Sequence, residues 1–209
     1  DLIHCCSDLE EQNLKKLSKK FNTVVLPFSI NKSDTKKNFS KKLYRKCIFF
    51  SRLHNQKGLD KLIKAWLTIN NKNWKLDIFG FGNSNYYIKK FKLNKNNNIR
   101  FLNPVINERK KFKLFDNYDF LVLPSSGESF GLAILEALTR RIPVLTTNMT
   151  PWQDIQIKNC GWIINDSLIE LKLVLNQIFN SSKNELLFKK KNTIKIVKNF
   201  YTHHVSKLY

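Results

Sequence analysis

Two glutamates separated by seven residues are the side chains of this chain best placed for chemistry. Glu128 lies in a loop of small residues that follows the apolar run 120–124, and Glu136 lies in the helix pattern that leaves this loop. A helix N-terminus presents free backbone N–H groups and the positive end of the helix dipole, and both favour phosphate. Carboxylates accept hydrogen bonds from sugar hydroxyls. The segment therefore predicts a site for a ligand that is both phosphorylated and rich in hydroxyl groups.

This segment is one of five that resemble, in order, the family 4 retaining glycosyltransferases of the GT-B fold. The five segments comprise residues 49–59, 78–82, 128–136, 150–154 and 160–163. The resemblance covers nearly the whole chain, and the last two segments are similar to those of bacterial members that build lipopolysaccharide or capsule. It implies an α/β fold with a doubly wound, Rossmann-like parallel sheet, the C-terminal half of a GT-B glycosyltransferase.

The resemblance implies catalytic roles for Arg52, Lys57 and Glu128. Arg52 and Lys57 would neutralise the donor diphosphate as it leaves, because fixed cations stabilise the charge of a departing nucleoside diphosphate without a metal. Glu128 would contact the transferred sugar through its hydroxyls. No metal and no cofactor are expected, because the chain has no Asp-x-Asp motif and its four histidines and four cysteines show no metal-ligand spacing.

A second group of residues is expected to bind the donor. Gly131, with Phe130 and Leu132, would offer backbone N–H groups to the phosphates or the sugar at the start of the helix. Ser129 belongs to the same motif, and the Phe130 side chain itself is interpreted as a core aromatic. Glu136 would bind the ribose, because one carboxylate can accept hydrogen bonds from both hydroxyls of a vicinal diol.

Gly80 and Val105 complete the expected donor site. Gly80 is interpreted as part of a tight turn, which with only one further nearby glycine, Gly82, does not make a dinucleotide-binding fingerprint. Val105 lies where members of the family pack the nucleotide base, mainly against backbone. The sequence therefore leaves the base and the sugar of the donor open.

Short apolar runs alternate with helix patterns from residue 47 onward. Strands are expected at 47–52, 74–80, 98–102, 119–124, 143–147 and 161–164, and helices at 58–70, 84–93, 107–116, 129–140, 167–180 and 183–199. This alternation predicts a parallel sheet covered on both faces. Ligands bind at the carboxyl ends of such strands, so Arg52, Gly80 and Glu128 should meet at one edge of the sheet.

The chain is expected to contain parts of two domains. A helix over 7–19, opened by a capping-box pattern, and a strand over 23–27 make residues 1–28 a remnant of the end of an acceptor domain. Polar, lysine-rich residues 29–46 are expected to be a linker, and residues 47–200 the donor-binding domain. The resemblance implies that residues 201–209 form a terminal helix that packs back toward the first domain.

The net charge is +21, from 37 basic and 16 acidic residues. It could steer an anionic substrate, hold the protein at an anionic membrane or bind nucleic acid, or it could reflect only a Lys/Asn-rich composition. We favour the last explanation, with membrane attraction as a by-product, and interpret lysine runs such as 110–111 and 189–191 as solvated helix faces. The sequence contains no uncharged apolar run of about 18 residues, so no transmembrane helix is expected.

The resemblance implies a retaining glycosyltransferase that transfers a sugar from a nucleotide-sugar donor to an acceptor glycan in bacterial surface-polysaccharide synthesis. The chain would supply the donor site and be weakly active or inactive alone. Expected partners are the donor, a glycan or lipid-linked glycan acceptor and an anionic membrane surface, in the cytoplasm or at the inner face of its membrane. Two alternatives stay open: another GT-B enzyme such as a sugar phosphorylase or epimerase, and a basic nucleic-acid-binding module, which the scattered basic residues disfavour.

Overall fold

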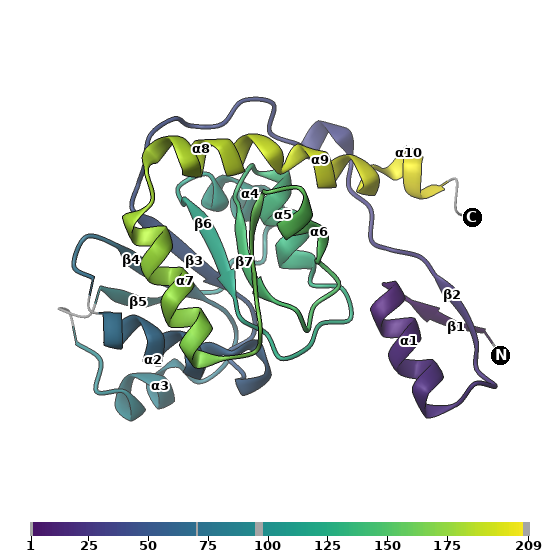
Figure 1. The fold of residues 1–209 in the computed structure, drawn as a ribbon, viewed down its shortest axis with the longest axis horizontal. Coiled ribbons are helices and arrows are strands. Elements are labelled where there is room, and N and C mark those ends of the chain that lie inside the picture. The colour runs from purple at the N-terminus through teal and green to yellow at the C-terminus, as the bar shows by residue number, and fades with distance from the viewer. Residues whose placement is uncertain (1, 70, 95–97, 207–209) are drawn as a thin grey trace.

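A six-stranded parallel sheet forms the centre of the protein in the computed structural model, which describes residues 2–69, 71–94 and 98–206 (Figure 1). The strands are β3 (Lys46–Phe50), β4 (Lys75–Phe79), β5 (Ile99–Leu102), β6 (Phe120–Leu123), β7 (Val144–Thr147) and β8 (Gly161–Ile164). They lie in the order β5-β4-β3-β6-β7-β8. Each predicted strand of this region is confirmed, with ends that differ by at most two residues.

Helices cover both faces of this sheet. They are α2 (Leu59–Ile69), α3 (Ser84–Lys90), α4 (Glu108–Phe115), α5 (Leu132–Thr139), α6 (Asp154–Ile157), α7 (Leu168–Asn180), α8 (Lys183–Asn192) and α9 (Ile194–Val197). Strand order reverses direction between β3 and β6, so right-handed crossovers place α2 and α3 on one face and α4, α5 and α6 on the other. In Figure 1 α7 packs with α2, and α8 and α9 run across one end of the sheet. The fold is therefore doubly wound.

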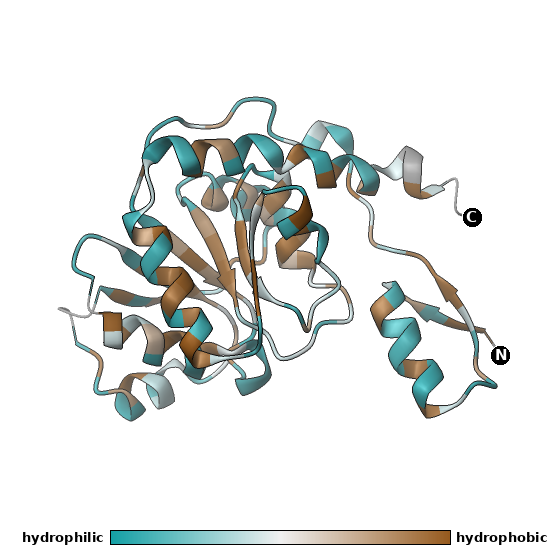
Figure 2. Ribbon diagram, in the orientation of Figure 1, coloured by the Kyte–Doolittle hydropathy of each residue, from teal (hydrophilic) through white to brown (hydrophobic). Residues whose placement is uncertain are grey.

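Apolar side chains concentrate between these layers. Figure 2 shows the central strands as the most hydrophobic part of the ribbon, with hydrophilic residues toward the outer surfaces of the helices. All four residues of β6 and of β7 are buried. A strand that is buried on both faces can be apolar along its whole length rather than alternately, as β6 is, which explains why this strand was predictable.

The first residues form a separate small unit, in which β1 (Leu2–Cys5) and β2 (Asn22–Val25) pair in parallel around α1 (Asp8–Leu17). Figure 1 shows this unit beside the main domain rather than in its sheet. The predicted cap of α1 is present: Ser7 Oγ accepts from the Glu10 N–H at 3.2 Å. In a capping box the Glu10 carboxylate would accept from the N–H of the N-cap residue, Ser7. Here it accepts from the N–H of Cys6 instead, at 2.6 Å.

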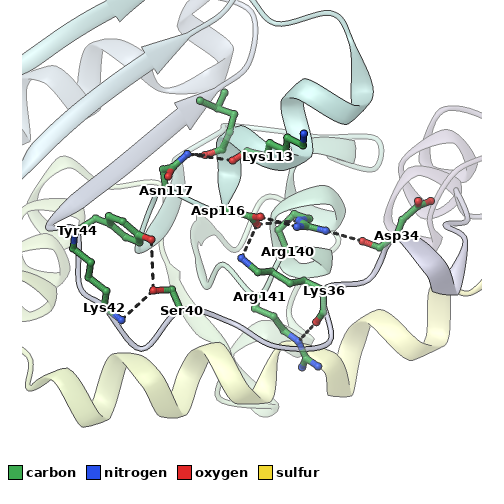
Figure 3. Close-up of polar contacts among 11 residues, drawn as sticks. Asp34, Lys36, Ser40, Lys42, Tyr44, Lys113, Asp116, Asn117, Arg140 and Arg141 are labelled. Carbon is green, nitrogen blue, oxygen red and sulfur yellow. Dashed lines mark hydrogen bonds and ion pairs between the residues drawn. The ribbon is translucent and has the colours of Figure 1, made fainter.

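The segment between the two units is fastened to the main domain by charged side chains (Figure 3). Arg140 donates two hydrogen bonds to Asp116, Nε to Oδ1 at 3.0 Å and Nη2 to Oδ2 at 2.7 Å. Lys36, in the expected linker, makes an ion pair with the same carboxylate at 3.1 Å. Arg141 Nε donates to the carbonyl oxygen of Lys36 at 2.8 Å. The expected linker thus follows a defined path over the ends of α4 and α5.

The C-terminal segment contacts the chain where the expected linker begins. Ile30 pairs in parallel with Tyr201, and the Thr202 N–H donates to the Ile30 carbonyl oxygen at 3.0 Å. A short helix, α10 (Thr202–Val205), follows. Residues 207–209 of the expected terminal helix lie outside the described residues.

Across the part of the chain that the structure describes, no helix has the length and apolar character needed to cross a membrane.

The lysine run at 189–191 differs from the expected solvated face. Lys189 and Lys190 are buried, and Lys190 Nζ lies 2.9 Å from Asp119 Oδ1, at the start of β6. Lys189 Nζ donates to Asn159 Oδ1 at 2.6 Å. Burial lowers the pKa of Lys189. The expectation is wrong for these two residues because α8 packs across the end of the sheet, where a carboxylate needs a counter-charge.

Candidate functional site

A pocket of about 950 Å³ lies between α1 and the loop that follows β6. The main domain lines it with Arg52, Gln56, Lys57, residues 126–132, Asn148 and Met149, and the first unit with Cys6, Phe28 and residues of α1. Seven of the expected site residues are among these: Arg52, Lys57, Glu128, Ser129, Phe130, Gly131 and Leu132. The pocket is at the carboxyl edge of the parallel sheet, as predicted from the strand ends.

Lys57 and Glu128 form an ion pair inside this pocket. Lys57 Nζ and Glu128 Oε2 are 2.7 Å apart, and the two side chains are 12% and 9% exposed. The other carboxylate oxygen, Glu128 Oε1, is buried and has no hydrogen-bond partner among the described residues. A buried polar atom without a partner is rare in folded proteins and marks a position where a further donor can bind.

A glycine brings Lys57 close to the Glu128 loop. Lys57 ends a short 3₁₀ turn, η2 (Asn55–Lys57), and Gly58 follows it with φ +73°. A Cβ atom at Gly58 would lie 1.9 Å from the carbonyl oxygen of Pro124. Only glycine has both this conformation and this space, so the turn can pack directly against the end of β6, from which the loop to Glu128 starts.

Hydrogen bonds hold the first part of the loop in place. Ser125 is fully buried, and its hydroxyl lies 3.0 Å from the Gln56 carbonyl oxygen. The Ser126 N–H donates to the same carbonyl at 2.8 Å. Thr147, at the end of β7, donates its hydroxyl to the Ser125 carbonyl oxygen at 2.5 Å. The loop is therefore fixed on both sides before it reaches Glu128.

The helix that follows the loop starts without a side-chain cap. Its N-cap is Gly131, with φ +84°, and α5 begins at Leu132. By contrast, α1, α4 and α7 are capped by Ser7, Asn107 and Ser167. The first N–H groups of a helix have no partner within it, so an uncapped N-terminus that lines a pocket can donate to an anion.

Phe130 packs into the core, as its interpretation as a core aromatic requires. It is 5% exposed and contacts the rings of Phe28, Trp152 and Phe200. The Trp152 indole N–H donates to the Phe130 carbonyl oxygen. These contacts fix the backbone immediately before Gly131 and leave only backbone groups of Phe130 for a ligand.

Arg52 is an exposed cation at the pocket wall. Arg52 follows the end of β3. Beyond it, the Leu53 N–H still donates to the Phe81 carbonyl oxygen at 2.8 Å, so the pairing of the two chain segments extends past Arg52. Its guanidinium makes no ion pair with any described residue. A guanidinium beside the Lys57 turn and the uncapped start of α5 makes this wall positive and suited to a phosphate group.

Glu136 is outside this pocket and is paired with a residue that sequence reasoning missed. It is 7% exposed and forms an ion pair with Lys111 of α4. The expectation that Lys111 lies on a solvated helix face is wrong, because its side chain is 13% exposed. The available signal was Glu136 itself: a carboxylate on an otherwise apolar helix needs a buried partner.

Gly80 and Val105 also lie outside the large pocket. A Cβ atom at Gly80 would lie 1.7 Å from the Ser51 carbonyl oxygen, so this glycine allows β3 and β4 to stay in contact beyond their ends. Gly80 lines a smaller cavity of about 240 Å³ together with Pro104. Val105 is half-buried against the core. Gly80 therefore lies on a separate hollow at the same sheet edge, and Val105 follows the end of β5 close by in the chain.

Two further features bear on the chemistry. Ser7, which the sequence suggested only as a helix cap, donates its hydroxyl to the Ser129 carbonyl oxygen at 2.5 Å and so joins the first unit to the site loop. Within the described residues, no group of three or more His, Cys, Asp or Glu side chains could hold a metal ion. Metal independence stays a prediction.

Comparisons with known proteins show that this chain is similar to glycosyltransferases in sequence and in fold. An uncharacterized glycosyltransferase of Methanocaldococcus jannaschii is 34% identical over 105 residues, which is 49% of this chain and 27% of that protein. The structure of WaaG, a glycosyltransferase involved in lipopolysaccharide biosynthesis, matches 98% of this chain and 61% of its own with a TM-score of 0.80 and 20% identity. A TarM variant from S. aureus, solved with fondaparinux, α-GlcNAc-glycerol and UDP, matches 98% of this chain and 42% of its own, with a TM-score of 0.80 and 17% identity.

The structural matches establish the fold as that of GT-B glycosyltransferases, of which this chain corresponds to a part. It spans about a quarter of the length of the M. jannaschii relative. The family model described as "Glycosyl transferases group 1" matches residues 31–199, which include both wall cations, the Glu128 loop and the Lys111–Glu136 pair. The chain therefore belongs to the group 1 glycosyl transferases.

Proposed function

We propose that this chain supplies the donor site of a retaining glycosyltransferase, which transfers a sugar from a nucleotide-sugar to an acceptor glycan in bacterial surface-polysaccharide synthesis. The observation that carries the proposal is the Glu128 carboxylate. One of its oxygens is held by Lys57 at 2.7 Å, and the other is buried in the pocket with no partner among the described residues. A sugar hydroxyl can donate to that second oxygen.

The positive wall of the pocket fits the donor diphosphate. Arg52, Lys57 and the uncapped N-terminus of α5 line the same pocket as Glu128. As the bond to the sugar breaks, the nucleoside diphosphate gains negative charge, and fixed cations and backbone N–H groups stabilise it without having to reorganise. In this proposal the residues act without a metal ion or a cofactor.

The nucleoside would extend from the diphosphate toward α4. Leu132 lines the pocket, and Glu136 lies one turn further along the same helix, where it would accept the ribose hydroxyls. Val105 and the Gly80 cavity lie beyond, at the ends of β5 and β4, and would receive the base. The TarM variant was solved with UDP, which supports a nucleoside diphosphate as the ligand class.

The acceptor would approach from the α1 side of the pocket, where the first unit forms the opposite wall. The relation to WaaG supports an acceptor of the lipopolysaccharide type, glycan or lipid-linked glycan. With such an acceptor the reaction would occur in the cytoplasm, at the inner face of the membrane, where the net charge of +21 would favour an anionic surface.

A calorimetric titration of this chain with UDP, GDP, ADP and a short oligonucleotide tests the proposal. We expect one nucleoside diphosphate to bind, and Arg52→Met to weaken it about tenfold, since a hydrogen bond to a charged group contributes about 1.5–3 kcal/mol. Lys64→Met, which removes an exposed charge from α2, is the matched control and should leave the affinity unchanged. Binding of the oligonucleotide without any of the nucleotides would overturn the proposal and favour a nucleic-acid-binding module.

A second assay separates the proposed reaction from the GT-B alternatives. The protein is incubated with the nucleotide-sugar whose nucleotide binds, and the products are separated by chromatography. A transferase releases the nucleoside diphosphate and shifts the sugar to an acceptor or to water, whereas an epimerase converts the sugar while it stays attached. A sugar phosphorylase would instead make sugar phosphate and a shortened glycan when a glycan and inorganic phosphate are supplied, without any nucleotide.

A further inference from the structure

The ion pair between Lys111 and Glu136 is a contact near the site that the proposed function does not explain. It joins α4 to α5, and both side chains are nearly buried, at 13% and 9% exposed. The neighbouring basic residues of α4, Arg109, Lys110 and Lys113, are all exposed. Lys111 is therefore the basic residue of this helix whose position is set by a partner and not by solvent.

Stability alone is a weak reason for such a pair. Replacing a buried ion pair by apolar residues of similar volume is often neutral or stabilising, because two charges must be taken out of water. The surrounding residues of α5, from Ile134 to Leu138, are apolar and buried. Apolar residues at positions 111 and 136 could therefore pack in place of the ion pair.

The pair lies between the two elements that border the expected nucleoside. Glu136 is four residues after Leu132, so it shares a helix face with a residue that lines the pocket. Lys111 is four residues after Asn107, the N-cap of α4, and the Lys111 N–H donates to the Asn107 carbonyl oxygen at 2.9 Å. The loop before Asn107 carries Val105. The ammonium group thus reaches from the base side of the site to the carboxylate on the other helix.

We infer that Lys111 is a positioning residue for ribose recognition, which holds the Glu136 carboxylate in the orientation that accepts the 2′-hydroxyl of the donor nucleotide. This inference rests on the proposed function. A Glu side chain has three rotatable bonds, and a fixed cation at one oxygen removes most of that freedom before the ligand arrives. Lys111 itself need not touch the nucleotide.

The test measures how the effect of Lys111 depends on the ribose hydroxyl. The whole chain is titrated with UDP, GDP and ADP and with their 2′-deoxy counterparts, using wild type, Lys111→Met, Lys111→Arg and Lys110→Met. Lys110→Met is the matched control, because it removes the same charge from the exposed side of the same helix. Circular dichroism melting confirms that each variant is folded, and Lys111→Met in a Glu136→Gln background closes a double-mutant cycle.

We expect Lys111→Met to weaken binding of the ribonucleotide about tenfold and binding of the 2′-deoxynucleotide less than about twofold. Lys111→Arg should restore most of the affinity, Lys110→Met should have no effect, and the loss should vanish in the Glu136→Gln background. Equal losses for both nucleotides, or none, would overturn the inference and leave a structural ion pair, while the proposed function would stand. If wild type binds no nucleoside diphosphate, the proposed function fails and this inference with it.

Discussion

Two buried lysine–carboxylate pairs in this protein have the same chemistry and opposite surroundings. Lys57–Glu128 lies in the pocket, and Lys190–Asp119 lies where α8 crosses the end of β6. Each pair joins residues 71 positions apart, so the cost of closing the intervening chain does not distinguish them. The N–O distances, 2.7 and 2.9 Å, do not distinguish them either.

The difference is in the second oxygen of each carboxylate. Asp119 Oδ1 accepts from Lys190, and Oδ2 accepts from the backbone N–H groups of Tyr44 at 2.9 Å and Lys46 at 3.3 Å. Glu128 Oε2 accepts from Lys57, and Oε1 has no partner among the described residues. Asp119 is saturated by the fold, whereas Glu128 keeps capacity for a ligand. A buried charge thus indicates a binding site only where its hydrogen-bonding capacity is incomplete.

The largest expected effect comes from removing one cation of each pair and measuring stability. Lys190→Met should lower the free energy of unfolding by about 3–5 kcal/mol, because it leaves the Asp119 charge buried without its partner. Lys57→Met should cost about 1 kcal/mol or less, since Glu128 faces a pocket that water can enter. Urea titrations give both values. Equal losses in the free energy of unfolding for the two variants would show that both pairs stabilise the fold to the same degree, which would contradict the comparison.

An intermediate effect is expected from neutralising the pocket carboxylate, measured with ligands. Glu128→Gln should weaken binding of the nucleotide-sugar about tenfold and leave the affinity for the matching nucleoside diphosphate within about twofold, because Glu128 is proposed to contact the sugar alone. Glu185→Gln, on the exposed first turn of α8, is the control for the change of charge. The same loss for both ligands would place Glu128 at the diphosphate and contradict its proposed role.

The sequence was sufficient for the architecture because the elements have strong local signals. Strands such as β6 are continuous apolar runs between helices, and such runs have few other stable arrangements. The start of one helix differs for a local reason: the helix expected from residue 129 begins at Leu132, because Gly131 has a left-handed conformation that a helix cannot continue. The site loop was placed correctly because it follows a predicted strand end.

The partners of the charged residues could not be predicted, because they depend on how elements far apart in the sequence pack together. Four basic residues occur within α4, and only the contact of that helix with α5 makes Lys111 the partner of Glu136. Lys190 likewise stands in a run of three lysines, and only the crossing of α8 over β6 selects it for Asp119. In a chain with 37 basic residues, spacing alone does not separate these lysines from solvated ones.

The smallest effect is expected at Lys189, the neighbour of Lys190, which is buried without a carboxylate within ion-pair distance among the described residues. Its ammonium donates to neutral oxygens, Asn159 Oδ1 at 2.6 Å and the Gly161 carbonyl at 3.3 Å. Burial lowers the pKa of Lys189 below the ordinary value of 10.5, so the unfolded chain binds the proton more tightly. Between the two values the unfolded state carries more protons, and stability contributed by this residue rises with pH.

Urea titrations at several alkaline pH values below 10.5 would measure this contribution as the difference between wild type and Lys189→Met. The wild type should gain stability relative to the variant as the pH rises. Lys191→Met removes an exposed charge two residues further along α8 and should show no such trend. A difference that falls with pH would mean that Lys189 is stabilised in its charged form. The contrast between Lys190, which has a carboxylate partner, and Lys189, which has neutral hydrogen-bond partners, would then disappear, because the charge of Glu185 would outweigh the cost of burial at Lys189.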